Sequence, residues 1–161
     1  MIDGAAWIRR LGLEEHPEGG WFRRIYTAAS TIETENGARP LATSIHYLLT
    51  RERPGGRLHR NRSDILHFLI DGGPVEYLLV TADGELRRVA LGHEERFLMV
   101  PGGWWKASQL MTGAPHALVA EVVTPGFDFA DHQFATLDDL RRECPQHLPV
   151  LSDFVAGSSA R

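Results

Sequence analysis

The chain has 161 residues, of which 43% are hydrophobic and 24% charged, and its formal net charge at pH 7 is -4. This length and apolar content predict one domain over residues 1–161 with a single hydrophobic core. The mildly acidic balance and the scattered arginines argue against nucleic acid as a partner. No apolar run reaches the roughly 20 residues of a membrane span, and the first residues lack a secretory signal, so we expect a cytoplasmic protein with no membrane partner.

The predicted elements begin with a short amphipathic helix over residues 5–13. After it, short runs rich in β-branched, aromatic and leucine residues alternate with glycine and proline turns, which is typical of an all-β domain. Asp83-Gly84 is the clearest hairpin turn. A short closing helix over 136–143 has Thr136 as its N-cap and Asp139 three residues later. We expect residues 156–161 to form a frayed tail. The predicted strands are 21–27, 42–49, 65–70, 75–81, 86–90, 97–100, 105–109 and 118–123.

Short strands in this number predict a sandwich, jelly roll or small barrel, because these architectures protect strand edges. Two segments narrow the choice: Gly56-Arg57-Leu58-His59 followed by Asp64, and later Pro101-Gly102-Gly103-Trp104-Trp105-Lys106. They resemble the paired motifs of the cupin superfamily, whose metal-binding members carry His-x-His-x4-Glu and Pro-x-Gly-x-x-His. The resemblance implies a single cupin jelly-roll β-barrel, to which the two predicted helices are added.

The four motif positions here hold Arg57, His59, Asp64 and Lys106. An arginine is a permanent cation, and a lysine must lose its proton before it can bind a metal. The sequence therefore predicts no metal and no other cofactor at these positions. The alternative is a metal site rebuilt by neighbouring side chains that point into the same cavity, namely His46, His67 or Glu121.

A more specific resemblance covers about residues 16–148. Five stretches carry it: His16–Arg23, Thr43–Leu49, His59–Asp64, Val100–Ser108 and Val123–Asp131. They look like a small bacterial and fungal cupin family often labelled predicted sugar epimerases. This resemblance implies a homodimer and a solvent-accessible pocket between two sheets, while the epimerase label rests on analogy with the fold of dTDP-sugar 3,5-epimerases. Glu121 departs from the family pattern, where a small or neutral residue is expected.

Lys106 is the only lysine, because 16 of the 17 Lys and Arg residues are arginine. Unlike a guanidinium, its ammonium can lose a proton when it is desolvated. His59 paired with Asp64 could act as a general base, and Lys106 with Arg57 could stabilise an oxyanion or bind an anionic group. If Asp64 points into the barrel, strand alternation turns His67 away. If Glu121 points inward, Lys106 or Arg57 is its expected counter-charge.

Three further side chains are candidate ligand contacts. Trp104 and Trp105 could offer an aromatic wall to a sugar ring, although tryptophans beside a glycine turn also occur as barrel plugs or dimer contacts. His46 has apolar neighbours, so a hydrogen-bonded structural role is its alternative.

These residue types suit proton abstraction next to a carbonyl group. The first hypothesis is a metal-independent epimerase or isomerase that acts on a small anionic or sugar-like metabolite. The second is a binding protein that holds such a molecule in the same cationic pocket without turnover. The third, a metal-dependent oxygenase or decarboxylase, requires the rebuilt metal site.

Overall fold

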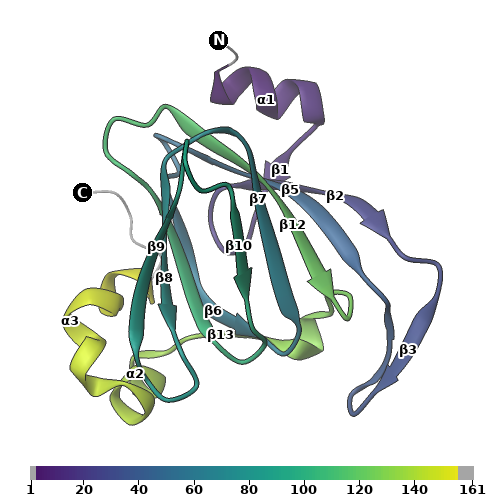
Figure 1. Cartoon of the computed structure of the whole chain (residues 1–161), viewed down its shortest axis with the longest axis vertical. Helices are drawn as coiled ribbons and strands as arrows, with labels where there is room; N and C mark the ends of the chain where they lie inside the picture. The colour runs from purple at the N-terminus through teal and green to yellow at the C-terminus, as the bar shows by residue number, and fades with distance from the viewer. Residues whose placement is uncertain (1–2, 156–161) are drawn as a thin grey trace.

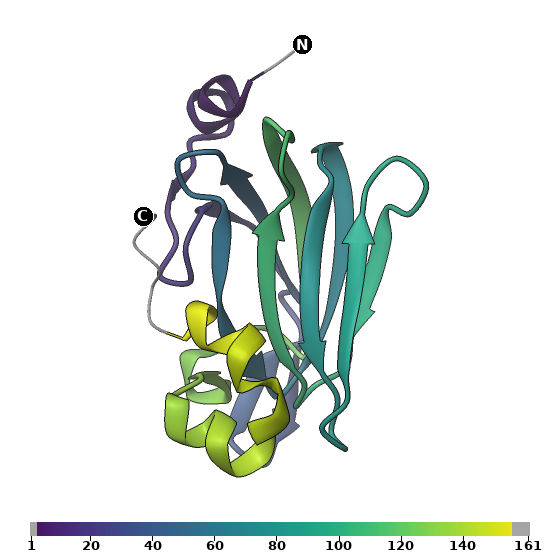
Figure 2. The same cartoon turned by 90° about the vertical axis from the view of Figure 1, so that its left-hand side faces the viewer.

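The computed structural model of the chain describes residues 3–155, so the predicted tail at 156–161 lies outside the described residues. Two antiparallel sheets face each other as a jelly-roll sandwich (Figures 1 and 2). The prediction of an all-β jelly roll with a short helix near each end is confirmed. Within residues 3–155, no helix is long and apolar enough to cross a membrane.

The first sheet has six strands, and β5 and β12 lie at its centre. Their residues pair in continuous register, from His116 opposite Thr50 to Val123 opposite Thr43. In spatial order the strands are β1 (Glu14–Glu15), β2 (Trp21–Thr27), β5 (Thr43–Thr50), β12 (His116–Thr124), β7 (Asp64–Gly72) and β10 (Phe97–Val100).

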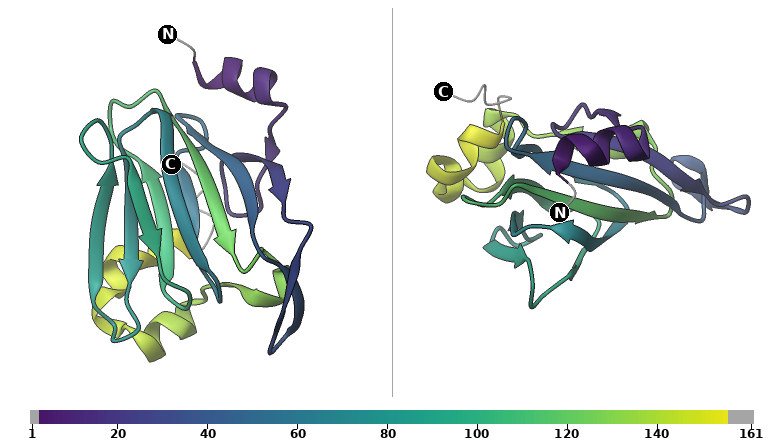
Figure 3. Two further views of the ribbon diagram at one scale, coloured as in Figure 1. Left: turned by 45° about the vertical axis from the view of Figure 1, so that its right-hand side comes forward. Right: turned by 90° about the horizontal axis from the view of Figure 1, so that it is seen from above.

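The second sheet has five strands, and a separate two-stranded hairpin projects beyond the sandwich (Figure 3, left). The hairpin consists of β3 (Thr31–Thr34) and β4 (Gly37–Pro40). In spatial order the five strands are β13 (His132–Phe134), β6 (Gly55–Asn61), β11 (Trp105–Leu110), β8 (Val75–Val80) and β9 (Leu86–Leu91).

All eight predicted strands are present, with ends shifted by two residues at most. Five strands were not predicted from the sequence: β1, β3, β4, β6 and β13. Of these, β6 matters most, since it carries His59. It was missed because Gly55, Gly56, Arg57 and Arg60 give it neither apolar alternation nor β propensity. The strand forms because it pairs on both sides, with β11 and β13.

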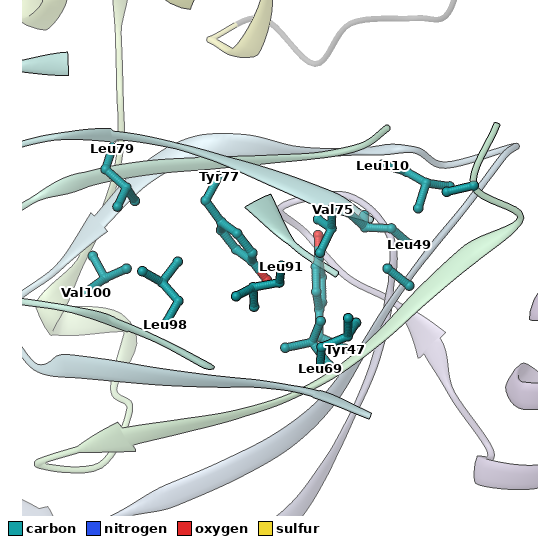
Figure 4. Packing of buried hydrophobic residues seen from close by; sticks show 13 residues of the cluster. Tyr47, Leu49, Leu69, Val75, Tyr77, Leu79, Leu91, Leu98, Val100 and Leu110 are labelled. Carbon is teal, nitrogen blue, oxygen red and sulfur yellow. The ribbon is translucent and has the colours of Figure 1, made fainter. Parts of the chain in front are cut away.

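The main core lies between the two sheets (Figure 4). Alternate residues of each strand point inward, as Tyr47 and Leu49 do on β5. They pack against leucines and valines of the other sheet, together with Tyr77 of β8, which is 1% exposed. The buried charged side chains of the interior lie beyond this apolar cluster, around a cavity.

Helices cover the outer faces of the two sheets. The first helix, α1 (Gly4–Leu11), is capped by Asp3, ends at Gly12 with φ 60° and packs on the six-stranded sheet through Trp7 and Leu11. The predicted capping box of α2 (Leu137–Glu143) is confirmed, since Thr136 and Asp139 exchange hydrogen bonds. Together with α3 (Leu148–Leu151), α2 packs on the outer face of the five-stranded sheet, beside β6 and β11 (Figure 2).

Candidate functional site

A cavity of about 330 Å³ opens at the end of the sandwich that the main core does not fill. The strands of the six-stranded sheet run from core to cavity: on β5 the inward residues change from Leu49 and Tyr47 to Ile45 and Thr43. Two tyrosines stand at the boundary, because Tyr47 lies 5.6 Å from the ring of His16 and Tyr77 lies 4.9 Å from that of His67. The cavity volume is at the lower end of the range of about 300–1,000 Å³ found for small-molecule sites.

Glu18 enters the cavity from the loop between β1 and β2. Gly19 and Gly20 follow it with φ values of 103° and 70°, which L side chains rarely adopt. A Cβ atom on Gly19 would also collide with the carbonyl oxygen of Gly55. Tyr47 donates its hydroxyl hydrogen to the Gly19 carbonyl at 2.9 Å. The two glycines therefore let the loop turn tightly and lie against β6, which fixes Glu18 at the cavity wall.

His59 and His132 reach Glu18 from the five-stranded sheet. His59 lies on β6, and His132 opens β13, which pairs with β6. The two rings stack with centroids 5.2 Å apart. His59 Nε2 lies 3.4 Å from Glu18 Oε2, and His132 Nε2 lies 3.0 Å from Glu18 Oε1. One ligand atom from each of the three residues falls within 4.8 Å of the other two.

The segment before β13 is anchored to the projecting hairpin. Asp131, the last residue of the 3-10 helix η1 (Phe129–Asp131), accepts a hydrogen bond from Arg39 Nε at 2.7 Å. It also accepts one from the side-chain amide of Asn36 at 2.8 Å. Arg39 and Asp131 are both buried. This ion pair positions the residue directly before His132 and so orients that ring toward the cavity.

A second polar cluster joins the two sheets beside the first. Lys106 extends from β11 to the opposite sheet, where its Nζ lies 2.8 Å from His67 Nε2 and 3.5 Å from Glu121 Oε2. His67 Nδ1 lies 3.1 Å from the Leu98 carbonyl, so Nδ1–H donates there and Nε2 accepts from the ammonium. Glu121 lines the cavity, with 10% of its side chain exposed. Its predicted pairing with Lys106 is therefore present.

Burial sets the protonation of these groups. It lowers the pKa of His59 to about 4 and, with the charge of Lys106, holds the pKa of His67 well below its usual range. Burial also raises the pKa of Glu121, and Lys106 offsets this only in part. Burial opposes ionisation of Glu18 too, but His59, the His132 hydrogen bond and the charge of Lys106 together hold its pKa below the usual range. At neutral pH the cavity thus contains neutral imidazoles beside carboxylates of unequal basicity.

The structure corrects the predicted pair of His59 and Asp64. Asp64 is exposed and accepts a hydrogen bond from the Gly102 backbone N–H at 2.9 Å, while His59 Nδ1 lies 2.7 Å from the Arg57 carbonyl oxygen. On β7 the odd-numbered residues Ile65, His67 and Leu69 point inward. Because side chains alternate along a strand, Asp64 points outward. The backbone carbonyl of Arg57, and not the carboxylate of Asp64, therefore accepts the hydrogen bond from His59 and orients its ring.

Four proposed ligand contacts lie outside this cavity. The Arg57 guanidinium stacks on Phe134 at 4.0 Å and lines a separate hollow, and alternation places His46 on the outer face of its sheet. Trp105 is buried under the C-terminal helices, where its Nε1–H donates to Glu143, and Trp104 packs against the main core. Since Arg57 lies outside this cavity and Lys106 is paired with Glu121, the cavity is not the cationic pocket that the sequence predicted.

The four standard cupin positions therefore do not converge on a metal. His46, His67 and Glu121 do not rebuild such a site either, because His46 faces outward and Lys106 binds the free nitrogen of His67. Sequence reasoning missed His16, Glu18 and His132, which complete the cavity. His16 and Glu18 lie in one of the stretches on which the family resemblance rests, His16–Arg23, and His132 directly follows another, Val123–Asp131. This resemblance was the available signal.

Aromatic side chains also line the cavity. Phe22, Phe127 and Phe129 contribute to its wall, and Phe129 is 70% exposed. The Phe127 and Phe129 rings meet edge to face with centroids 5.0 Å apart. Two more charged residues line the cavity, Arg24, which is exposed, and Asp128, which is partly buried. A ligand would therefore meet apolar faces as well as the buried polar clusters.

Comparison with known proteins agrees with this architecture. The family model described as Cupin superfamily (DUF985) matches residues 5–135. An uncharacterised protein of Saccharomyces cerevisiae, YML079W, is 36% identical over 146 residues, which are 79% of this chain and 72% of the yeast protein.

Two solved structures superpose over nearly the whole chain. A hypothetical protein from Leishmania major has a TM-score of 0.88 at 30% identity and covers 95% of this chain and 98% of its own. Protein SO0799 from Shewanella oneidensis has a TM-score of 0.85 at 28% identity and covers 96% and 98%. The family match, the jelly roll and these relatives show that the chain belongs to the cupin superfamily, in the family designated DUF985.

Proposed function

We propose that the cavity binds a small oxygenated metabolite and that the protein moves a proton on the carbon next to a carbonyl group, as an isomerase or an epimerase does. The observation that carries the proposal is Glu121, a buried carboxylate that lines the cavity and is held between Lys106 and His67. In this proposal Glu121 is the general base in place of His59, because Asp64 makes no hydrogen bond to His59 that would raise its basicity.

The position of Glu121 suits a general base. A carboxyl group works best when its pKa approaches the working pH, and burial raises the pKa of Glu121 above its ordinary value. Lys106 and His67 fix the carboxylate from behind, while its cavity side is left for a ligand. Glu121 would take the proton from carbon, and the C–H electron pair would move toward the carbonyl oxygen to give an enolate. In a hydroxy-carbonyl compound, the neighbouring hydroxyl proton can move to the enolate oxygen. Return of the carbon-bound proton to the former carbonyl carbon then completes an isomerisation, with the old hydroxyl as the new carbonyl. Return of the proton to the opposite face of the same carbon completes an epimerisation instead.

The rest of the cavity indicates a sugar-like ligand rather than a strong anion. Its carboxylates, Glu18 and Glu121, offset Lys106, so a second negative charge would gain little inside. Polar groups of Asn61, His16 and His132 can contact hydroxyl groups, and the phenylalanine rings can cover an apolar face of a sugar.

Hydrogen exchange tests the proposal without knowledge of the product. The protein is incubated in D2O with a panel of aldoses, ketoses and hydroxy acids, and proton NMR follows the signal on the carbon next to the carbonyl or carboxyl group. We expect one member to lose this signal with the wild-type protein. Glu121→Gln should abolish the loss. Glu76→Gln, which makes the same change on the outer face of β8, should leave it intact.

Two outcomes would contradict the proposal. Equal exchange in Glu121→Gln and wild type would remove Glu121 as the base. A panel member that raises the melting temperature but exchanges no hydrogen would instead support the hypothesis of a binding protein without turnover.

A further inference from the structure

Glu18, His59 and His132 form a group that the proton transfer by Glu121 leaves without a role. All three line the cavity, and they come from three separated parts of the chain: the loop before β2, the middle of β6 and the start of β13. Their side chains are largely buried, with exposures of 13%, 5% and 5%. His132 Nε2 and Glu18 Oε1 lie at a hydrogen-bonding distance of 3.0 Å, so the contact that needs an explanation is the one between His59 and Glu18.

The hydrogen bonding of His59 shows which atom faces Glu18. A carbonyl oxygen can only accept, so His59 Nδ1 must donate its hydrogen to the Arg57 carbonyl at 2.7 Å. In the neutral ring, Nε2 is then a bare lone pair, and it faces the Glu18 carboxylate at 3.4 Å. Two acceptors that face each other repel unless a cation lies between them. The geometry therefore calls for a positive charge at this point.

The residue types also match a metal site. Two imidazoles and one carboxylate with open positions are a ligand set used for divalent transition metals, including iron and zinc. A metal-bound histidine usually donates its other N–H to a backbone carbonyl or a carboxylate, as His59 does to Arg57. The ligand atoms lie within 4.8 Å of one another, close enough for one ion to contact all three after small side-chain adjustments.

We propose that Glu18, His59 and His132 bind one divalent transition-metal ion, whose remaining coordination positions face the cavity. Only His59 is shared with the standard cupin metal positions; Glu18 replaces ligands that Arg57, Asp64 and Lys106 cannot provide, and His132 completes the set from β13. Lys106 makes its contacts with Glu121 and His67, so its ammonium does not occupy the space between the three ligand side chains. One carboxylate against a divalent ion leaves a net positive charge for a ligand oxygen.

The site also narrows the ligand class, an inference that rests on the proposed function. A bound metal polarises a carbonyl oxygen and accepts a neighbouring hydroxyl oxygen. Glu121 lies on the facing wall of the same cavity, positioned to reach the carbon beside that carbonyl. The structure therefore favours a hydroxy-carbonyl compound that binds the ion through two adjacent oxygens.

Cobalt titration tests the metal site directly. Tag-free protein is stripped with a chelator, dialysed and titrated with Co²⁺ alone, followed by calorimetry and by the visible absorption of the bound ion. We expect saturation at a single equivalent per chain. His132→Gln and Glu18→Gln should each weaken binding by more than about 100-fold, the upper end of the effect of losing an outer-sphere partner. His46→Gln, a histidine on the outer face, should bind Co²⁺ like the wild type.

Circular dichroism and thermal melts of the metal-free variants establish that each is folded, and if one is not, the other carries the test. Absence of saturable Co²⁺ binding, or binding unchanged in both variants, would overturn the metal site. The D2O exchange assay separates this result from the proposed function. Exchange by a protein that binds no Co²⁺ would leave Glu121 as the base without a metal, whereas Co²⁺ binding without exchange would retain the metal and reject the proton transfer.

Discussion

The two ends of the space between the sheets are filled in opposite ways. At one end leucine, valine and tyrosine side chains form the main core. At the other end the same strands bury Lys106, Glu121 and two histidines around a cavity. On β12 the change takes place between Val119 and Glu121, two successive inward residues. The fold tolerates ionised groups in its interior as long as each has a partner across the sandwich.

This contrast shows what each end contributes. Apolar burial stabilises the sandwich at the core end, at about 25 cal/mol per Å² removed from water. At the cavity end, desolvation of a buried ion pair roughly cancels the attraction between its members. We therefore expect the core end to stabilise the fold and the cavity end to serve ligand binding and chemistry. The following substitutions test this difference between the two ends.

The largest effect is expected from Lys106→Ala. It leaves Glu121 buried without its counter-charge, and loss of one member of a buried ion pair costs about 3–5 kcal/mol. Chemical denaturation should show this loss in the free energy of unfolding. A loss below about 1 kcal/mol, as for an exposed pair, would mean that water reaches Glu121 and that the cavity end is not dry.

The double variant Lys106→Met with Glu121→Leu tests whether the buried ion pair itself stabilises the fold. Because both charges are replaced by apolar side chains of similar size, we expect a protein about as stable as the wild type or more stable. The D2O exchange should nevertheless be abolished, as in Glu121→Gln. A double variant as unstable as Lys106→Ala would show that the ion pair itself stabilises the fold.

At the core end, Leu49→Ala should cost about 3 kcal/mol, since it removes a side chain that is 1% exposed and leaves a void between the sheets. Co²⁺ binding and hydrogen exchange should stay at wild-type levels. If Leu49→Ala weakened either one, the two ends would be coupled through the strands rather than independent.

The smallest effect is expected from His67 on the pH dependence of stability. Its folded pKa lies well below 6.5, so as the pH falls through 6.5 the unfolded chain takes up a proton that the folded chain refuses. Stability then declines with falling pH by at most about 1.4 kcal/mol per pH unit from this group. The folded ring faces Lys106, Glu121 and the ring of Tyr77.

His67→Gln removes this proton uptake and keeps a group that can accept from Lys106. Denaturation curves between pH 7 and 5 should therefore be flatter for the variant than for the wild type. Glu121 has a raised pKa and acts in the opposite direction in both proteins, so the difference between them isolates His67. Parallel curves would show that His67 takes up its proton in the folded state.

Much of the fold follows from local sequence signals. The strands with apolar residues, the Asp83-Gly84 turn and the Thr136 capping box were predicted because each depends on a few adjacent residues. β6 and β13 could not be predicted in this way. They owe their existence to pairing with strands distant in sequence, which no local pattern encodes.

The site was predicted only in part for the same reason. His59 and Lys106 lie in the cavity region, as motif spacing indicated, and Glu121 takes the inward one of the two orientations that alternation left open. Asp64 was placed on the wrong face, since the choice between the two faces of β7 depends on a single residue of register. Glu18 and His132 are separated from His59 by 41 and 73 positions, and the topology alone brings them together.

Lys106 is the only side-chain amine in the sequence, and it is 4% exposed. An acylating reagent should therefore not react with this side chain in the folded protein and should modify it once the two sheets separate. The mass of one added acyl group on Lys106 then marks each molecule whose sandwich has opened at least once. The residue that joins the sheets is in this way also a built-in chemical probe of their separation.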